Sequence, residues 1–460
     1  MSDGARNVMR MTSQGVQELT DRTIGAVHER GDAGLAGSFP IQNTLFSVDP
    51  DVVVEPAAEG DVVAAVRFAA AQDLPIRVVA TGHGIHADLT GGLLVSTGGL
   101  GGVSVDPATR IARVGAGTRW ADVIAAGAPH GLLPIAGASG HVGTVGLVAG
   151  GGLGPLSASH GAASDYARAF RVVLADGSVV DVDASTHPDL FWALRGGKGP
   201  FGVVVSMDVE LVPLARLYGG VLFFDAPHIE AALTAWVDWL EHKPADMSTS
   251  VANMALPPLP FVPEPLRGRT VLAVRVGYPG SEEDGAAALA PLRAAAPLHL
   301  DLVGEMPASA VGSIHNDPED PGPAWIRGGG LTAFGQDAAS RLLELVGPGT
   351  DTPFVVTEIR AFGAAWAGDV AGGSAVGGRS APFSVAHIGP DPTRHDAMAE
   401  RADAVAASLA GWRAPETNIN FVSGAFTAEK AALAWAPEVR ERLAGVRREH
   451  DPDARFGFPL

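Results

Sequence analysis

The sequence predicts an α+β protein of two domains, and three features of the chain carry this prediction. The 460 residues exceed the usual size of one domain, and an apolar fraction of 47% is enough for large buried cores. Short strands and short helices alternate through the first half. Beyond about residue 215, strands with alternating apolar residues are separated by longer helices, which is typical of an antiparallel sheet with helices on one face.

The first half is predicted to begin with a strand, a helix with an apolar stripe and two further strands (52–56, 61–74, 75–82 and 91–97). Two β-hairpins follow, and the second contains the Asp176–Gly177 turn, a strong hairpin signal (103–117 and 170–183). One helix lies between the hairpins, and a second helix precedes a long strand (118–131, 187–197 and 202–213).

The second half is predicted to contain four strands and four helices (219–226, 270–279, 353–362 and 383–389; 229–242, 283–296, 336–346 and 394–412). Three segments rich in Gly and Pro are predicted to be loops (257–268, 317–330 and 371–382). The last segment contains a helix at 438–449, and we expect it to return to the first domain.

Composition excludes several classes of function. The net charge of −19 repels nucleic acid and anionic membranes. The absence of cysteine excludes disulfides, Cys-ligated zinc and iron–sulfur clusters. The sequence contains no segment that resembles a signal peptide or a transmembrane helix, so we expect a cytoplasmic monomer or homodimer.

Glycine-rich loops dominate the motifs of the first half. The segments 82–87 (GHGIHA) and 197–202 (GKGPFG) both fit a dinucleotide-binding pattern, but neither lies between a strand and a following helix, so a Rossmann site is not predicted. Such loops can instead hold a diphosphate through consecutive backbone N–H groups. The segment 143–166 is also rich in glycine, which suggests backbone packed closely against a flat ligand.

A series of motifs occurs in a fixed order: PIRVVATGHG, GVSVDPATRIARVGAGTRWADV, VGTVGLVAGGGLGPLSASHG, VVLADGSVVDVD, HPDLFWALRGGKGPFGVVVSMDVEL and a terminal DPDARF. In this series the chain resembles the FAD-linked oxidases of the vanillyl-alcohol-oxidase and p-cresol-methylhydroxylase (PCMH) type, in the berberine-bridge-enzyme-like branch. The resemblance is close over about 45–215 and about 415–458, and weaker between them.

The resemblance implies an FAD domain formed by residues 1–215, with a core at about 45–215, and by the returning segment 415–460. It implies that residues 216–414 form an inserted substrate domain with an antiparallel sheet. It also implies that the loop Ala80–Gly84 wraps the diphosphate and that His83 is joined covalently to the flavin. The other implied FAD-binding residues are Ser139, Gly143, Thr144, Gly146, Gly150, Gly151, Gly152, Leu153, Val204 and Asn420.

The chain departs from the family at two positions. Many relatives form a second covalent flavin bond through a cysteine that corresponds to about Val142, so attachment at two points is excluded here. Relatives often have Tyr-x-Asn near the C-terminus, with the tyrosine as base, where this chain has Asn418-Ile419-Asn420. An amide cannot remove a proton from a substrate hydroxyl, so the base must lie elsewhere.

Substitutes for the missing base occur in the middle of the chain. Glu358 and Arg360 are two residues apart in a predicted strand and therefore share one face. Glu358 could act as base and Arg360 could hold a carboxylate or enolate oxygen, or the two could form a solvent-exposed ion pair. His387 and His315 are further candidates, although lone histidines are more often structural.

The resemblance implies hydride transfer from a small organic substrate, an alcohol or an intermediate of secondary metabolism, to flavin N5, with O2 as the electron acceptor. Two alternatives remain open at this stage. Without the tyrosine base, the protein could use FAD in a non-redox cyclisation or elimination. It could also be a flavin-binding protein with a degenerate active site.

Overall fold

The computed structural model describes residues 13–85, 87–260, 262–422 and 427–457. The prediction that the N-terminus carries no signal peptide concerns residues that lie partly outside this range. Residues 423–426 of the predicted returning segment 415–460 also lie outside this range. Within the described residues, the chain forms three large sheets and one small parallel pair.

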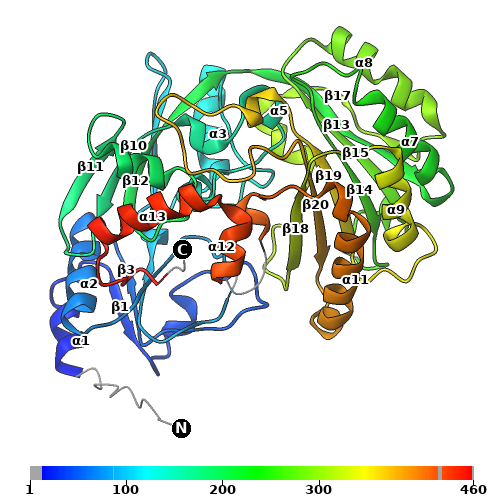
Figure 1. Cartoon of the computed structure of the whole chain (residues 1–460). Helices are drawn as coiled ribbons and strands as arrows, with labels where there is room; N and C mark the ends of the chain where they lie inside the picture. The colour runs from blue at the N-terminus through cyan, green and yellow to red at the C-terminus, as the bar shows by residue number, and fades with distance from the viewer. Residues whose placement is uncertain (1–12, 86, 261, 423–426, 458–460) are drawn as a thin grey trace.

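The first sheet has the strand order β1-β3-β6-β4, and β6 is parallel to both of its neighbours. Its strands and the adjoining helices lie early in the chain (Figure 1): α1 (Ser13–Thr20), β1 (Ala26–Glu29), β3 (Val52–Glu55), α2 (Glu59–Ala71), β4 (Ile76–Val79) and β6 (Leu93–Ser96). The short strands β2 (Val48–Asp49) and β5 (Leu89–Thr90) pair beside it. The apolar face of α2 packs on this sheet and buries Val62, Ala65 and Val66 completely.

The second sheet has the order β11-β10-β12-β8-β7, with β9 paired to the far end of β12. Both predicted hairpins are present as antiparallel pairs. The elements of this region are β7 (Val103–Asp106), β8 (Ile111–Gly115), α3 (Trp120–Gly127), β9 (Leu132–Pro134), α4 (Thr144–Ala149), α5 (Ser157–His160), β10 (Ala167–Val173), β11 (Val179–Asp183), α6 (Pro188–Leu194) and β12 (Val203–Pro213).

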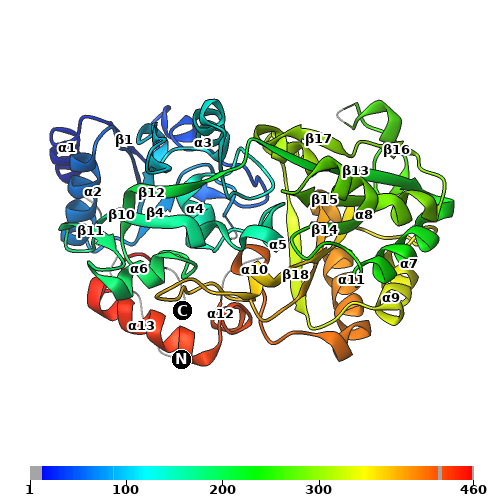
Figure 2. The same ribbon diagram turned by 90° about the horizontal axis from the view of Figure 1, so that it is seen from above.

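The third sheet belongs to the middle of the chain and has the order β16-β13-β15-β14-β19-β20-β18, with β17 also paired to β13. All of its described pairs are antiparallel. Its strands are β13 (Arg216–Asp225), β14 (Ser248–Ala255), β15 (Thr270–Tyr278), β16 (Leu300–Asp301), β17 (Gly304–Pro307), β18 (Trp325–Leu331), β19 (Val356–Ala361) and β20 (Phe383–Gly389). Seen from above, this sheet and its helices lie beside the first half of the chain (Figure 2).

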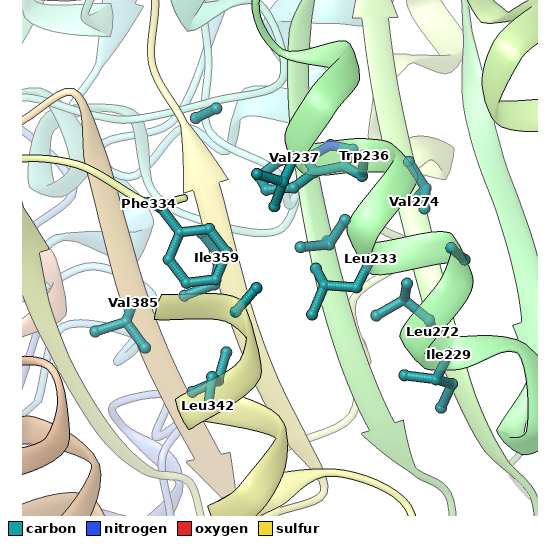
Figure 3. Packing of buried hydrophobic residues seen from close by; sticks show 14 of the residues in the cluster. Ile229, Leu233, Trp236, Val237, Leu272, Val274, Phe334, Leu342, Ile359 and Val385 are labelled. Carbon is teal, nitrogen blue, oxygen red and sulfur yellow. The ribbon is translucent and has the colours of Figure 1, made fainter. Parts of the chain in front are cut away.

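One face of the third sheet is covered by helices, as the alternating pattern predicted. The helices are α7 (Ile229–Trp239), α8 (Glu282–Ala295), α9 (Gln336–Val346) and α11 (His395–Ser408). Figure 3 shows Leu233 and Trp236 of α7 near sheet residues such as Val274 and Ile359. The opposite face carries a smaller apolar cluster that includes Val221, Phe223 and Val271, and polar side chains lie on the same face.

The end of the chain lies against the first half. Helix α12 (Ala428–Ala434) is followed by α13 (Pro437–His450), which contacts α6, and Arg442 pairs with Asp189 at 2.7 Å. Beyond α13, the amide of Ile76 in β4 donates to the carbonyl of Arg455 at 2.7 Å. The short helix α10 (Ala364–Ala367) of the middle segment contacts α5 of the first half.

Four strands of the third sheet were not predicted, namely β14, the short strands β16 and β17, and β18. Strand β14 was not recognised between α7 and β15, and β18 lies largely inside the segment 317–330 that was predicted to be a loop. The loop prediction was wrong for residues 325–330 alone, because the glycines of this part serve close packing. A Cβ added to Gly330 would lie 2.3 Å from the carbonyl of Glu416, and one added to Gly328 would lie 3.0 Å from Phe421.

The described part of the chain contains no helix with the length and apolar character needed to cross a lipid bilayer.

Candidate FAD and substrate site

The first predicted flavin loop follows β4. Gly82 has φ of +74°, and a Cβ there would lie 2.5 Å from the carbonyl of Pro40, so the turn requires glycine. The hydroxyl of Thr81 lies 2.9 Å from His83 Nδ1 and accepts a hydrogen bond from the amide of Gly143 at 3.2 Å. Thr81 therefore joins the first loop to the start of the second one.

His83 is largely shielded from solvent, and its surroundings favour the neutral imidazole. Burial lowers the pKa of His83 to about 4, and the positive charge of Arg119 and the proximity of His141 act in the same direction. Asp317 acts in the opposite direction. At neutral pH, His83 therefore retains a nitrogen lone pair, which a nucleophile requires.

The second loop contains α4 and the glycines that follow it. Gly151 and Gly152 have φ of +95° and +79°. A Cβ on Gly152 would lie 2.6 Å from Ala163, and one on Gly150 would lie 2.1 Å from Asn420 Oδ1. Protein packing by itself thus requires glycine at positions 150 and 152, and their approach to a flat ligand stays a prediction.

Asn418 and Asn420 of the returning segment hold the second loop. Both side-chain amides donate to the carbonyl of Gly150, at 3.1 and 3.2 Å, and Asn418 Oδ1 accepts from the amide of Asn420. Asn418 is buried. In this geometry Asn418, which occupies the position of the relatives' tyrosine, holds the second loop in place, and a catalytic role for it stays a prediction.

Lys198 is a site residue that we did not single out from the sequence. Its Nζ donates to Asn420 Oδ1 at 2.9 Å, and a Cβ added to Gly84 would lie 3.8 Å from this Nζ. Its backbone amide donates to the carbonyl of Ala149 at 2.7 Å. Burial lowers the pKa of Lys198 to about 8. The ammonium therefore lies where the first loop, the second loop and the returning segment meet.

Lys198 has a φ of +64°, a left-handed conformation that costs a residue with a side chain about 1 kcal/mol. Glycine would avoid this cost, and the flanking Gly196 and Gly199 also have positive φ. The sequence signal was the one charged residue in the run GGKGPFG.

The residues present fit a bound FAD. The Cβ direction of Gly146 is open, with no described atom within 4 Å, and the nearest atom to that of Gly84 is the Lys198 ammonium. Backbone at these two glycines can thus approach a ligand, and the nearby cation suits a diphosphate or a flavin oxygen.

The remaining predicted FAD-binding residues are placed as follows. Ser139 Oγ accepts from the amide of His141, Val204 lies in β12 within the core, and Leu153 packs with Trp366 and Val376. Thr144 is completely buried at the start of α4, and its hydroxyl has no hydrogen-bond partner among the described residues. Gly143, which precedes Thr144, is buried where the two loops meet.

A polar cluster lies on the face of the third sheet that the helices leave uncovered. The register places Ser250 of β14 opposite both Arg275 of β15 and Arg360 of β19. Glu358 accepts from Ser250 Oγ at 2.7 Å and from Arg275 Nη1 at 2.9 Å through Oε1, and pairs with Arg360 Nε at 2.7 Å through Oε2. The side chain of Glu358 is 3% exposed, so a solvent-exposed ion pair is the wrong interpretation.

Glu358 is unsuited to the role of base. Burial alone raises the pKa of Glu358, but the guanidiniums of Arg360 and Arg275 outweigh it and hold the pKa well below its usual range. Both carboxylate oxygens are already occupied by donors. A carboxylate that binds protons so weakly contributes little as a general base at neutral pH.

His387 lies on the opposite face of the sheet from Glu358. Its Nδ1 is 3.0 Å from Thr357 Oγ1, and its ring stacks on Phe354 with centroids 4.6 Å apart. Burial lowers the pKa of His387 to about 3. The structure thus separates His387 from the cluster and corrects its predicted catalytic role.

A cavity lies between the uncovered face and the first half of the chain. It is lined by Gly154, Pro155 and Ser157 from the first half and by Ser250, Arg275, His315 and Arg360 from the middle segment. The returning segment is close by, since the guanidinium of Arg360 lies 5.2 Å from the centre of the Phe421 ring. The cavity is thus formed by parts of the chain that are distant in sequence.

The chain is similar to known proteins in its first half and, for one relative, over nearly its whole length. Residues 50–183 match the FAD binding domain family. The FAD-dependent monooxygenase FUP4 of Fusarium proliferatum is 35% identical over 221 residues, which is 47% of this chain and 43% of the relative. The (R)-6-hydroxynicotine oxidase of Paenarthrobacter nicotinovorans is 28% identical over 450 residues, 94% of this chain and 95% of the relative. The first curated relatives are matched over less than half of their own length.

Solved structures share the fold. The 6-hydroxy-D-nicotine oxidase of Arthrobacter nicotinovorans superposes with a TM-score of 0.82 at 24% identity, over 94% of this chain and 96% of that chain. The BBE-like 1 protein of Physcomitrella patens gives 0.81 at 17% identity, over 96% and 98%.

The chain therefore contains an FAD binding domain in the two-domain α+β fold of the PCMH-type flavoproteins. The predicted resemblance to FAD-linked oxidases agrees with the match to (R)-6-hydroxynicotine oxidase, and the BBE-like 1 protein shares the fold.

Proposed function

We propose that this chain is an FAD-dependent oxidase that oxidises a small organic substrate, an alcohol or a secondary-metabolite intermediate. The observation that carries the proposal is the position of the polar cavity between the FAD binding domain and the third sheet. Of the relatives and structural neighbours named above, FUP4 is a monooxygenase and the two hydroxynicotine proteins are oxidases, which agrees with redox chemistry.

FAD, when bound, supplies a two-electron acceptor for the substrate, and we propose O2 as the final acceptor. The residues 80–84, 143–152, Lys198 and Asn420 hold it. The first half contributes the segment 154–157 to one side of the cavity, and the sheet supplies charged groups on the other. These walls exclude water and orient the substrate.

We further propose that FAD is attached covalently to His83 and at one point only. The neutral imidazole of His83 is a suitable nucleophile for the flavin 8α-methyl carbon, and the chain has no cysteine for a second bond. The solved glucooligosaccharide oxidase of Acremonium strictum carries a 6-S-cysteinyl, 8α-N1-histidyl FAD and shares the fold, with a TM-score of 0.80 at 18% identity. We also propose that residues 1–215 and 415–460 form the FAD domain and that residues 216–414 form the substrate domain.

Acid precipitation tests the covalent bond. We expect the precipitate of the wild-type protein to stay yellow and that of His83→Ala to release its flavin into the supernatant. His130→Ala, at the surface end of a short 3₁₀ helix, is a matched control that should keep the colour. Complete release of flavin from the wild-type protein would contradict covalent attachment and leave FAD binding intact.

Anaerobic mixing with candidate substrates tests the oxidase function. Bleaching of the absorbance at roughly 450 nm, followed by peroxide release when air is admitted, is the expected result. Product formed without bleaching would support the non-redox cyclase instead. A protein that binds FAD but neither bleaches nor forms product with any substrate tested would support the flavin-binding alternative.

A further inference from the structure

The cavity beside the third sheet carries an excess of positive charge. Arg275 and Arg360 both line it, and within the part of the chain that the structure describes the one carboxylate that contacts them is that of Glu358. Among the described lining residues there is no aspartate or glutamate. Two guanidiniums against one carboxylate leave a net charge of +1 in a shielded site, and burying such a charge is costly unless an anion balances it.

The donors of the two arginines are only partly used by Glu358. Arg275 reaches it through Nη1, with Nη2 3.9 Å from the Met254 sulfur, and Arg360 reaches it through Nε. Each guanidinium has five N–H donors in a planar fork that matches a carboxylate. The arrangement thus leaves N–H groups of both arginines for an anionic group in the cavity.

His315 lines the same cavity and is the group there best suited to accept a proton. Its side chain is 7% exposed, and its Nε2 lies 3.5 Å from Glu358 Oε1. Neither ring nitrogen has a hydrogen-bond partner among the described residues. Burial lowers the pKa of His315, and the charges of Arg275 and Arg360 act in the same direction while Glu358 opposes them.

Glu358 has the position of an orienting group for this histidine. A carboxylate beside one ring nitrogen selects the tautomer in which the other nitrogen carries the lone pair, and it stabilises the imidazolium once a proton has arrived. Glu358 also holds both guanidiniums in place. It therefore acts through its neighbours as a positioning residue.

We propose that this cavity binds a substrate carboxylate at Arg275 and Arg360 and that His315 accepts the proton lost on oxidation. The proposal rests on the oxidase function given above. In the step, the substrate O–H bond breaks and its proton forms an N–H bond on His315. The electron pair left on oxygen becomes the second C–O bond. The hydrogen of the adjacent C–H bond leaves with its electron pair as hydride and passes to the acceptor that FAD supplies.

Carboxylate probes test the anion site on the yellow holoprotein. Acetate, phenylacetate and benzoate, with benzamide as the neutral counterpart of benzoate, are titrated while flavin absorbance and thermal stability are followed. We expect at least one carboxylate to bind and benzamide to bind at least about tenfold more weakly than benzoate. Arg275→Met and Arg360→Met should each weaken carboxylate binding about tenfold or more, whereas Glu358→Gln should preserve or strengthen it.

Absence of binding by all three carboxylates, or equal binding of benzoate and benzamide, overturns the anion site. Failure of the oxidase proposal is a separate result, because it appears as a colourless protein or as flavin that no substrate bleaches. A yellow, substrate-reducible protein that ignores carboxylates retains its proposed function and loses only this inference.

The pH dependence of carboxylate affinity tests His315. The charged groups that face it are Glu358 and Arg360 of β19 and Arg275 of β15. A guanidinium does not lose its proton in this pH range and the three probes are mostly ionised above about pH 5, so His315 is the group of this cluster that adds positive charge as pH falls. We expect wild-type affinity to rise between pH 8 and pH 5, and the slope to vanish in His315→Gln.

His242→Gln, an exposed histidine just beyond α7, is the matched control and should keep the wild-type slope. His315→Asn is the second variant should the glutamine variant not fold. Retention of the wild-type slope in a folded His315 variant, or an unchanged pH profile of anaerobic flavin reduction, overturns the role of His315.

Discussion

At the scale of single residues, Lys198 shows how a local cost identifies a functional contact. Its left-handed conformation is unfavourable, and burial disfavours its charged form, yet its Nζ is held against Asn420 beside the open position of Gly84. A residue kept in such a conformation points to a function that glycine could not serve. The structure brings Lys198 and Asn420 together across 222 residues of sequence.

In the His83→Ala background, where no covalent bond holds the flavin, we predict that Lys198→Met weakens FAD binding by roughly tenfold, because it removes the cation that we propose to hold the cofactor. Lys198→Gly should weaken FAD binding as much while unfolding at a higher temperature than Lys198→Met, because glycine relieves about 1 kcal/mol of backbone strain. Flavin content and thermal unfolding of both variants are the measurements. A flavin content in both variants equal to that of His83→Ala alone would show that the ammonium serves the fold alone.

We expect His387 to affect the pH dependence of the protein's stability. Its folded pKa, about 3, lies below the ordinary value of 6.5, so the unfolded chain binds more protons than the folded chain between these values. The free energy of unfolding should therefore fall as pH drops below about 6.5, with a loss near 2 kcal/mol at pH 5 from this residue. Denaturant unfolding of the wild type and of His387→Gln at pH 7 and pH 5 measures the difference.

A variant without the titrating ring should lose less stability between the two pH values, although it is less stable at both. An equal pH-dependent loss in His387→Gln and in the wild type would assign the acid sensitivity to other groups.

At the scale of elements, the third sheet has two faces with different tasks. The helix-covered face is apolar and contains Leu233 of α7, which is 2% exposed, and Ile359 of β19. The other face carries Glu358 and Arg360, the neighbours of Ile359 along the same strand. Because side chains alternate along β19, the residue that packs against the helices and the residues of the polar cluster lie on opposite faces of the sheet.

We predict that Leu233→Ala lowers the free energy of unfolding by about 3 kcal/mol, because it leaves a cavity in the helix layer. Flavin content and carboxylate affinity should be unchanged, since the lost contacts lie on the far face of the sheet. Denaturant unfolding and flavin absorbance provide the two readouts. Loss of flavin from a folded Leu233→Ala protein would contradict this separation of the faces.

Strand patterning predicted both hairpins of the first half and four strands of the middle sheet, because alternating apolar residues and the Asp176–Gly177 turn are local signals. It failed for β18 (WIRGGGL), where three glycines resemble a loop. Those glycines allow the returning segment to pack on the strand, with Gly330 facing Glu416 and Gly328 facing Phe421. These glycines are explained by a tertiary contact, so no rule based on local sequence could reveal this strand.

At the scale of the whole molecule, the two halves are tied together near the cavity. Asn43 of the first half donates through Nδ2 to the carbonyl of Ala324 at 2.9 Å and accepts from the amide of Ala324 through Oδ1 at 3.0 Å. Thr44 donates to the carbonyl of Gly322, and His141 pairs with Glu319 at 2.9 Å. These contacts hold the segment 319–324 against the FAD binding domain.

We predict that Asn43→Ala lowers the free energy of unfolding by about 1 kcal/mol, because it leaves part-buried backbone groups of Ala324 without their partners. Calorimetric unfolding should broaden or split as the two halves unfold less cooperatively. Gln17→Ala, on the exposed face of α1, is the control and should unfold like the wild type. A single sharp transition at the wild-type temperature in Asn43→Ala would show that these bonds do not couple the halves.

Turn chemistry and apolar periodicity are local properties, so the sequence by itself predicted the hairpins and the helix-covered sheet. Its resemblance to a known family predicted the FAD binding domain. Only the tertiary structure decided how the polar residues are used. It placed Arg275 and His315 beside Glu358, gave both carboxylate oxygens to donors, turned His387 to the other face and brought Lys198 to Asn420. The physical reason is that proton affinity and ligand charge depend on neighbours brought together by strand register and chain return, which are distant in the sequence.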